Sequence, residues 1–593
     1  MAAEPMGFLV LAAGPWYSSS LLLAAVSIVW LVLAYRWYGR HIERRLVSPT
    51  DTPTPAHAQR DDVDFQPAKP IVLFGHHFAS IAGAGPILGP VLAVAFFGWG
   101  PTALWILLGV VLIGAVHDYM ALMISVRNRG ASLPDVARTA VSGSARVLFL
   151  VFVWIGLVLV ITAFCNAAVD TFLEAPEIVV PTFSLMLIAV LFGVMNYRLQ
   201  LNTALNTVIA LVLLFAVIIL GFVWKIDLQA LGLSEDGARY VWLGVLIGYG
   251  VLASVLPVWI LLQPRDYIAT WILIFGMGLG FAGILVVAPS FKAPAFTTAM
   301  AKPGPIWPML FILVACGAVS GFHCLVAGGT TSKQLGRERQ GLMVGYGAML
   351  TEGALAIMAL IAAGAGLYYA SVPDGAEGFA LLEVLKQGGG PITAFGRGFG
   401  VLTRPFMKPI GDWIGVQRLG MVVGTTMVNA FVMTTLDTTV RLTRFITTEL
   451  VGQHVRVFRN RLVASLAAVI PAFLLALNRQ AFNRIWQLFG ASNQLIGALA
   501  LLVITAYLLK RGKPVLYTLI PAIFMLVTTM AALVWQAYGY LVVPPPDKRE
   551  YVLGITALVL LALALVLAVQ GLMVRRPKAP LPGGGIAEEA AEA

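Results

Sequence analysis

The chain of 593 residues is 59% hydrophobic and only 11% charged. Because soluble domains carry about 25% charged residues, this composition excludes a soluble globular protein. The net charge of +11 does not indicate nucleic-acid binding, since most basic residues fall in short loops between apolar runs, as in membrane proteins. The three cysteines lie in apolar runs and form neither a disulfide framework nor a CxxC metal motif.

Fifteen segments are candidates for membrane-spanning helices, which need about 20 mostly apolar residues. They begin near residues 19, 71, 101, 145, 181, 204, 240, 266, 305, 345, 418, 462, 484, 514 and 550. The first residues lack the positive region of a signal peptide, so the first span is expected to be retained. The sequence therefore predicts an all-α integral membrane protein with about 15 transmembrane helices.

The basic residues predict the direction of the chain through the membrane. With the N-terminus outside and the C-terminus cytoplasmic, the inner loops hold 26 of the 39 Lys and Arg residues and the outer loops hold 13. Since inner loops of membrane proteins carry the excess of positive charge, this orientation is expected.

Span 2 contains helix-breaking residues within a long apolar segment, namely Pro86 and Pro90 beside Gly83, Gly85 and Gly89. A proline in a helix frees a backbone carbonyl, and hydrocarbon tolerates such a group only where protein or a polar cavity surrounds it. The alternative is a kinked helix that packs closely through its small residues.

Span 7 carries similar residues, Gly248, Gly250 and Pro257, and runs in the opposite direction to span 2. Paired discontinuous helices in two inverted halves indicate a transporter with a central binding site. We therefore expect a core of two inverted five-helix repeats, with discontinuous helices at spans 2 and 7.

The expected organisation follows from these spans. Residues 1–70 hold the first span and a Pro-rich cytoplasmic loop, 71–239 the first half (spans 2–6), and 240–445 the second half (spans 7–11). The second half includes a long outer loop, 371–417, for which a lid or gate is one interpretation. Residues 446–576 form peripheral spans 12–15, and 577–593 a disordered cytoplasmic tail.

Several ionisable residues lie at membrane depth, where they are costly and usually line a functional pathway. All fall in the cytoplasmic half of their spans: His76, His77, His117, Asp118, His323, Glu352 and Asp437. Glu352 has no basic residue in its own span and is the favoured proton carrier. At least one of the adjacent histidines of span 2 is expected to serve packing, because the two cannot face the same way.

Structural roles are the alternatives. Asp118 and its neighbour His117 could pair with Arg127, and Asp437 could pair with Arg441 four residues later on the same helix face. The hydroxyl groups of Thr330 and Thr331, with freed carbonyl groups of span 2, could bind Na⁺. Alternatively, these threonines only end a helix.

The sequence resembles the carbon-starvation protein A (CstA) family from about residue 30 to 510. The resemblance is carried by "FGHHFASIAGAGPILGPVLA" (74–93), "GAVHDYMALMISVRNRGASL" (114–133), "QPRDY" (263–267), "ACGAVSGFHCLVAGGTTSK" (315–333), "AMLTEGALAIMALIAA" (348–363), "TTLDTTVRLTRF" (434–445) and "WQLFGASNQLIGALAL" (486–501). It implies a multi-pass protein of a prokaryotic inner membrane that takes up peptides or pyruvate during carbon starvation, the latter with protons. It also implies a LeuT-like core, in which span 2 is the first helix and span 9 the eighth.

The combined hypothesis is a secondary active transporter, most simply a proton symporter, without cofactor or bound metal. The expected substrate-binding residues are His77, Gly83, Ala84, Gly85, Pro86, Tyr249, Gly250 and Ser254. The expected residues for H⁺ or Na⁺ coupling are His76, His323, Glu352, Thr330 and Thr331. The expected gate consists of Asp118, Asp437 and Arg441.

Two other classes compete with this hypothesis. The histidines and carboxylates could form an intramembrane zinc enzyme, but neither HExxH nor GxSxG occurs, so we do not expect an enzyme. A nutrient sensor on a transporter fold is the other alternative, although no soluble output domain is attached.

Overall fold

The computed structural model describes residues 18–61, 64–257, 260–367, 390–411, 415–478 and 482–574. Apart from one short hairpin, β1 (Met300–Ala301) with β2 (Gly304–Pro305), its regular elements are helices. The first half of the chain holds α1 (Ser20–Leu33), α2 (Arg40–Ile42), α3 (Pro55–Ala58), α4 (Pro70–Ile81), α5 (Gly85–Phe97), α6 (Trp99–Gly109), α7 (Ala115–Arg127), α8 (Leu133–Ala140), α9 (Gly143–Glu174), α10 (Val179–Gly193), α11 (Thr203–Val223), α12 (Glu235–Val255) and α13 (Leu262–Val287). The second half holds α14 (Ile306–Leu313), α15 (Phe322–Gly329), α16 (Ala348–Ile361), α19 (Gly390–Gly411), α20 (Val416–Leu450), α21 (Arg461–Ala476), α22 (Phe482–Lys510), α23 (Leu516–Leu541) and α24 (Tyr551–Leu572).

The helical membrane class is confirmed. Within the described ranges, 12 helical stretches are long and apolar enough to cross a membrane, and the bent pair α4–α5 makes up to 13. The remaining two expected spans correspond to the short helices α14 and α15 and to the 16-residue α21. The count of fifteen therefore stays a prediction.

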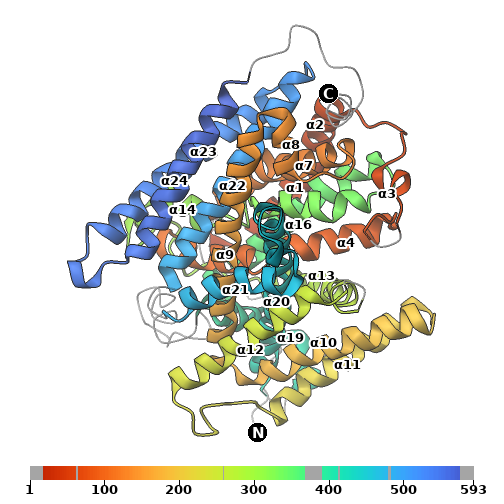
Figure 1. Ribbon diagram of the computed structural model, residues 1–593. Coiled ribbons are helices and arrows are strands. Elements are labelled where there is room, and N and C mark those ends of the chain that lie inside the picture. Colours follow the sequence, from red (N-terminus) through yellow and green to blue (C-terminus); the bar gives the residue numbers. More distant parts are fainter. Residues whose placement is uncertain are drawn as a thin grey trace, which may run out of the picture.

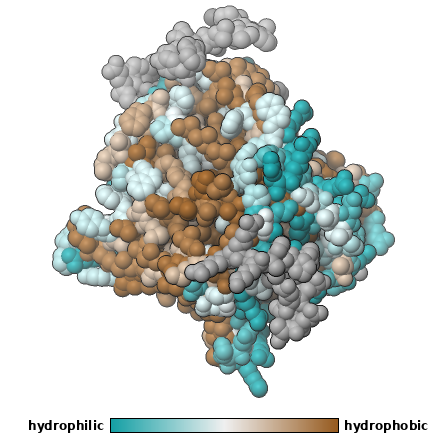
Figure 2. Space-filling model, turned by 90° about the horizontal axis from the view of Figure 1, so that it is seen from above, coloured by the Kyte–Doolittle hydropathy of each residue, from teal (hydrophilic) through white to brown (hydrophobic). Residues whose placement is uncertain are grey.

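The helices are arranged in a central group and a periphery. The long helices α9 and α20 pack against each other and against α12 and α21 (Figure 1). Helix α22 packs against α9, and α16 packs against α5. In the central stretch 418–450, 94% of the most apolar window is buried, against 33% in α11. Peripheral helices such as α11, α23 and α24 expose large apolar side chains, and Figure 2 shows a broad hydrophobic area on one face. Such a surface is what lipid tails require.

The expected break in span 2 is confirmed. Helix α4 ends at Ile81, residues 82–84 are not helical, and α5 begins at Gly85 with a bend of 45°. Pro86 lies in the first turn of α5, where its missing N–H costs nothing. Pro90 lies inside α5, which remains helical.

The expected break in span 7 is wrong, because α12 is continuous from Glu235 to Val255. Gly248 has open space around it and Gly250 packs against Val440, so both glycines are accommodated within an intact helix. Pro257 follows the end of the helix instead of interrupting it.

The second discontinuous helix lies in expected span 9. Helix α14 ends at Leu313 and α15 begins at Phe322, with residues 314–321 between them. This segment contains no proline, and its glycines, Gly317 and Gly321, allow close approach of other main chains. The eight-residue interruption leaves two helices of only eight residues each.

The two interruptions cross each other. A Cβ atom at Gly85 would collide with Cys316, and one at Gly89 would lie 2.5 Å from the carbonyl oxygen of Leu313. From the other side, a Cβ atom at Gly317 would lie 3.4 Å from Pro86 Cα. The small residues of both segments therefore allow backbone-to-backbone contact at the centre of the protein.

The loops differ in how far the structure describes them. In the loop expected to be outside, 371–417, residues 390–411 form α19, which packs against α5, α13 and α20. The part of this loop from residue 371 to 389 and the tail at 577–593 lie outside the described residues. The Pro-rich loop before α4 packs against the segment after α15, since Ala68 N donates to Gln334 O and Thr54 Oγ1 donates to Gly336 O.

Candidate functional site

Four buried ionisable side chains form a connected chain between α7, α15 and α16. The imidazole groups of His117 and His323 each bind one oxygen of Asp118, with Nδ1–oxygen distances of 2.8 and 2.7 Å. The other ring nitrogen of His323, Nε2, lies 3.4 Å from Glu352 Oε2. All four side chains are 0% exposed. We call these residues the buried quartet.

Glu352 is the least satisfied member of the buried quartet. Neither of its carboxylate oxygens has a hydrogen-bond partner among the described residues, and His323 is its ion-pair contact. Because an isolated charge in a dry interior is very costly, this carboxyl group is stable only when it carries a proton or faces a protonated imidazole. The pair is therefore suited to exchange a proton.

The buried quartet lies beside the first discontinuous helix. Helices α15 and α16, which carry His323 and Glu352, both pack against α4. The quartet forms a chain and not a coordination shell: within the described ranges, no three His, Cys, Asp or Glu side chains are arranged to hold a metal ion.

The adjacent histidines of α4 face different neighbours, as expected. His77 is buried, and its Nδ1 lies 2.9 Å from Thr331 Oγ1. His76 is partly exposed, and its Nδ1 lies 3.7 Å from Asp266. Thr331 is therefore engaged with an imidazole, and Thr330 donates its hydroxyl hydrogen to the carbonyl of Val326.

A second buried cluster joins α12, α13 and α20. Arg265 of α13 forms ion pairs with Asp437 of α20 and with its own neighbour Asp266. Tyr249 of α12 donates its hydroxyl hydrogen to Asp437 at 2.7 Å and accepts one from Arg265 at 2.7 Å. The expected layer of ionisable groups is thus divided into two clusters, and His76 contacts the second.

The expected pairing of Asp437 with Arg441 is replaced by these contacts. Arg441 instead donates to the carbonyl oxygens of Ala253 and Leu256, both at 2.7 Å, at the end of α12. The carboxylate of Asp437 thus binds a cation from another helix because Arg441 is needed to satisfy carbonyl groups that α12 leaves free where it ends. Asp118 likewise pairs with histidines, while Arg127 pairs with Glu338.

The expected substrate-binding residues lie in two places. Gly83 and Ala84 lie in the interruption between α4 and α5, and Gly85 and Pro86 form the first turn of α5. On α12, Tyr249 belongs to the Arg265 cluster, Gly250 contacts Val440, and Ser254 Oγ lies 3.0 Å from Ser465 Oγ. The expected half-site on α12 depended on a break that this helix does not have.

Sequence reasoning missed the residue that fixes the second interruption, Asn493 of α22. Its Oδ1 accepts from the backbone N–H of Phe322 at 2.9 Å, and its Nδ2 donates to Ser320 Oγ at 3.1 Å and to Cys316 Sγ at 3.2 Å. Its own carbonyl accepts from Gly321 N. Only the "GASNQ" segment, polar within an apolar span, indicated a special role.

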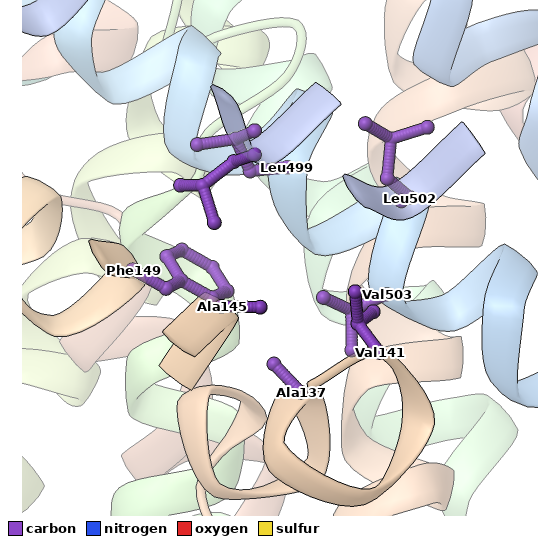
Figure 3. Close-up of a pocket in the computed structure, with 9 residues that line it drawn as sticks. Ala137, Val141, Ala145, Phe149, Leu499, Leu502 and Val503 are labelled. Carbon is purple, nitrogen blue, oxygen red and sulfur yellow. The ribbon is translucent and has the colours of Figure 1, made fainter. Parts of the chain in front are cut away.

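A small cavity between α8, α9, α22 and α24 is not a solute site. It measures about 10 Å³ and is lined by apolar side chains, including Val141, Phe149, Leu499 and Leu502 (Figure 3). This volume is about that needed for one water molecule, and the lining offers no polar partner to hold it. We interpret it as a packing gap.

A family profile and two known proteins match most of the chain. The family profile described as "Carbon starvation protein CstA" matches residues 19–532. The chain is 34% identical to the pyruvate/proton symporter BtsT of Escherichia coli (strain K12), over 87% of this chain and 81% of that protein. It is 32% identical to the peptide transporter CstA of the same organism, over 90% and 83%.

Solved structures give a weaker likeness. The crystal structure of MhsT in complex with L-phenylalanine aligns with a TM-score of 0.46 and 13% identity, over 86% of this chain and 98% of that one. A likeness at this level does not establish the fold.

Proposed function

Because the chain belongs to the carbon starvation protein CstA family, we propose that it is a secondary active transporter that takes up pyruvate or small peptides by proton symport. The names of its relatives support both substrates, and the name of the E. coli symporter supports the proton. In this proposal the protein lies in the cytoplasmic membrane with its N-terminus outside, which the distribution of basic residues supports.

The observation that carries the proposal is the contact between the buried quartet and the interrupted helix. Among the described residues Glu352 has no hydrogen-bond partner, and it faces His323; the helices that carry both residues pack against α4. A proton bound between these two side chains is therefore carried by helices that pack against α4, the helix that ends just before the non-helical residues 82–84. Solute binding there and protonation of Glu352 are therefore adjacent events, as symport requires.

We further propose that the solute is held at the interruption between α4 and α5, beside the closely packed crossing with α14–α15. The positive end of the α5 dipole at Gly85 attracts a carboxylate. In this arrangement the second inverted half begins at α14 and not at α12. Two pairs of contacts support this division. Helix α13 packs against α4, and α22 packs against α15. Helices α12 and α21 both pack against α9 and α20.

The thiol of Cys316, the hydroxyl of Ser320 and the amide of Asn493 are polar groups at the second interruption. Coupling to H⁺ is proposed over Na⁺, since His323 and Glu352 form a buried pair that can bind a proton and the name of the E. coli symporter includes the proton. Asp437, Arg265 and His76 are proposed to hold the inner half of the site closed, because together they tie α20 and α13 to α4.

The test uses purified full-length protein in liposomes. An inwardly directed pH gradient should drive accumulation of labelled pyruvate or a labelled dipeptide, and replacing potassium by sodium should change nothing. Glu352→Gln and His323→Ala should abolish accumulation but leave exchange of internal and external substrate, because exchange needs no net proton release. The matched control is Glu550→Gln, which removes a carboxylate paired with Arg484 outside the quartet.

Accumulation at the wild-type level by the Glu352→Gln and His323→Ala variants would contradict the proton assignment. Absence of both uptake and exchange of every tested substrate by the wild-type protein would contradict the transport function itself.

A further inference from the structure

We propose that Thr435 of α20 binds the substrate directly, and that its hydroxyl group recognises an oxygen atom next to the carboxylate of a 2-oxo or 2-hydroxy acid. This inference rests on the proposed transport function and narrows the substrate to a chemical class. Thr435 did not stand out in the sequence, because α20 is rich in threonine.

The hydroxyl of Thr435 differs from those of its neighbours. Thr434, Thr439 and Thr443 each donate their hydroxyl hydrogen to the carbonyl oxygen four residues earlier in α20, which is the usual arrangement in a membrane helix. Thr435 is only 3% exposed, yet its Oγ1 has no hydrogen-bond partner among the described residues. A buried hydroxyl without a partner is unfavourable, so a ligand that supplies one is expected.

This hydroxyl points at the interruption between α4 and α5. A Cβ atom added at Gly83 would lie 2.6 Å from Thr435 Oγ1 and 3.6 Å from Phe164 Cζ on α9. Gly83 is thus enclosed by a hydroxyl on one side and an aromatic ring on the other. A side chain at this position would collide with the hydroxyl of Thr435.

The second polar feature at the same place is the start of α5. This helix has 13 residues, its first turn has no side-chain cap, and its N-terminus lies two residues after Gly83. A carboxylate is the group that such an end attracts. With the carboxylate held there, the hydroxyl of Thr435 can donate to, or accept from, the oxygen on the adjacent carbon of the acid.

The remaining surroundings favour a short acid without an ammonium group. The atoms nearest to a Cβ position at Gly83 belong to Thr435 and Phe164, and neither side chain is charged. Phe164 is backed by Trp486 and Phe489, whose ring centroids lie 6.2 and 5.7 Å from its own. This apolar wall suits a methyl group and limits the length of the substrate.

The experiment compares inhibition of labelled-pyruvate exchange by unlabelled pyruvate, lactate and propionate. Propionate lacks the oxygen atom on the carbon next to the carboxylate. For the wild type, propionate should be the weakest inhibitor. Thr435→Val should weaken inhibition by pyruvate and lactate about tenfold and leave propionate unchanged, whereas Thr435→Ser should resemble the wild type. Thr434→Val is the matched control, because its hydroxyl is satisfied within the helix, and it should change none of the three values.

Unchanged discrimination between pyruvate and propionate in Thr435→Val would overturn the inference while leaving transport intact. A wild-type protein that exchanges neither pyruvate nor a dipeptide would instead overturn the proposed function. Should Thr435→Val fail to fold, Thr435→Cys gives a second measurement. Saturating pyruvate should slow modification of the new thiol by a small methanethiosulfonate reagent, and an unchanged rate would overturn the inference.

Discussion

Arg265 of α13 and Asp437 of α20 form an ion pair in which both side chains are fully buried, although 172 residues separate them in the sequence. Asp266 and Tyr249 complete the cluster, and His76 connects it to α4, the first part of the discontinuous helix. Each charge of this buried pair is stabilised only while the other is present.

Removing one partner should therefore be costly. Arg265→Met or Asp437→Leu alone is expected to lower the free energy of unfolding by about 3–5 kcal/mol, because the other charge remains buried and unpaired. The double variant should recover most of this loss. Thermal unfolding of the purified proteins in detergent measures the effect, and a double variant that is no more stable than the single ones would contradict a pairwise origin.

The crossing of the two interruptions predicts a sharp difference between glycines. Gly89→Ala places a methyl group 2.5 Å from the carbonyl oxygen of Leu313 and should destabilise the protein by about 1–3 kcal/mol, since the backbone cannot move aside. Gly248→Ala is the control, because open space surrounds it in a continuous helix. Alanine should be neutral or slightly stabilising there. Equal losses of thermal stability at both positions would contradict this geometry.

Asn493 is expected to be necessary for the shape of the second interruption. Asn493→Leu leaves the N–H of Phe322 and the hydroxyl of Ser320 without their partner and should cost about 1–3 kcal/mol of stability. Substrate exchange should fall as well, because residues 314–321 lose their fixed position. Ser492→Ala, which removes only a hydrogen bond to Phe489 within the same helix, should behave like the wild type in both measurements.

The inner loop offers a test of both packing and orientation. Glu338 accepts hydrogen bonds from Arg127 and from the backbone and side chain of Thr50. Glu338→Ala should release this segment and speed tryptic cleavage at Arg60, in inverted membrane vesicles only. Asp51→Ala, which breaks an exposed pair with Arg339, should change little. Cleavage in right-side-out vesicles would reverse the proposed orientation.

The apolar segments and the break at residues 82–84 could be predicted from the sequence, because length, hydropathy and Pro86 are local signals. The second break could not. Gly248 and Gly250 have the composition of a broken helix, yet a lipid-facing or close-packed glycine is compatible with an intact one. Residues 314–321 lack a proline, and their interruption depends on Asn493, which arrives from a distant helix.

The same distinction between local sequence signals and contacts made only on folding applies to the candidate site. Glu352 and His323 were identified because an ionisable side chain in a span is conspicuous by itself, and the structure brings them to 3.4 Å. The partner of Asp437 was missed because the nearest arginine in sequence, Arg441, is used to satisfy carbonyl groups of α12. Thr435 was missed because its distinguishing feature, an unused hydroxyl, exists only after folding.

Gly85 lies against the small side chain of Cys316, and Gly89 lies against the main chain of Leu313, so the two interrupted helices touch closely. This close packing leaves no room for larger side chains. Substitutions at the crossing therefore cannot be used to change the transported substrate. Redesign for new solutes must instead act through the flanking walls that α9 and α20 provide.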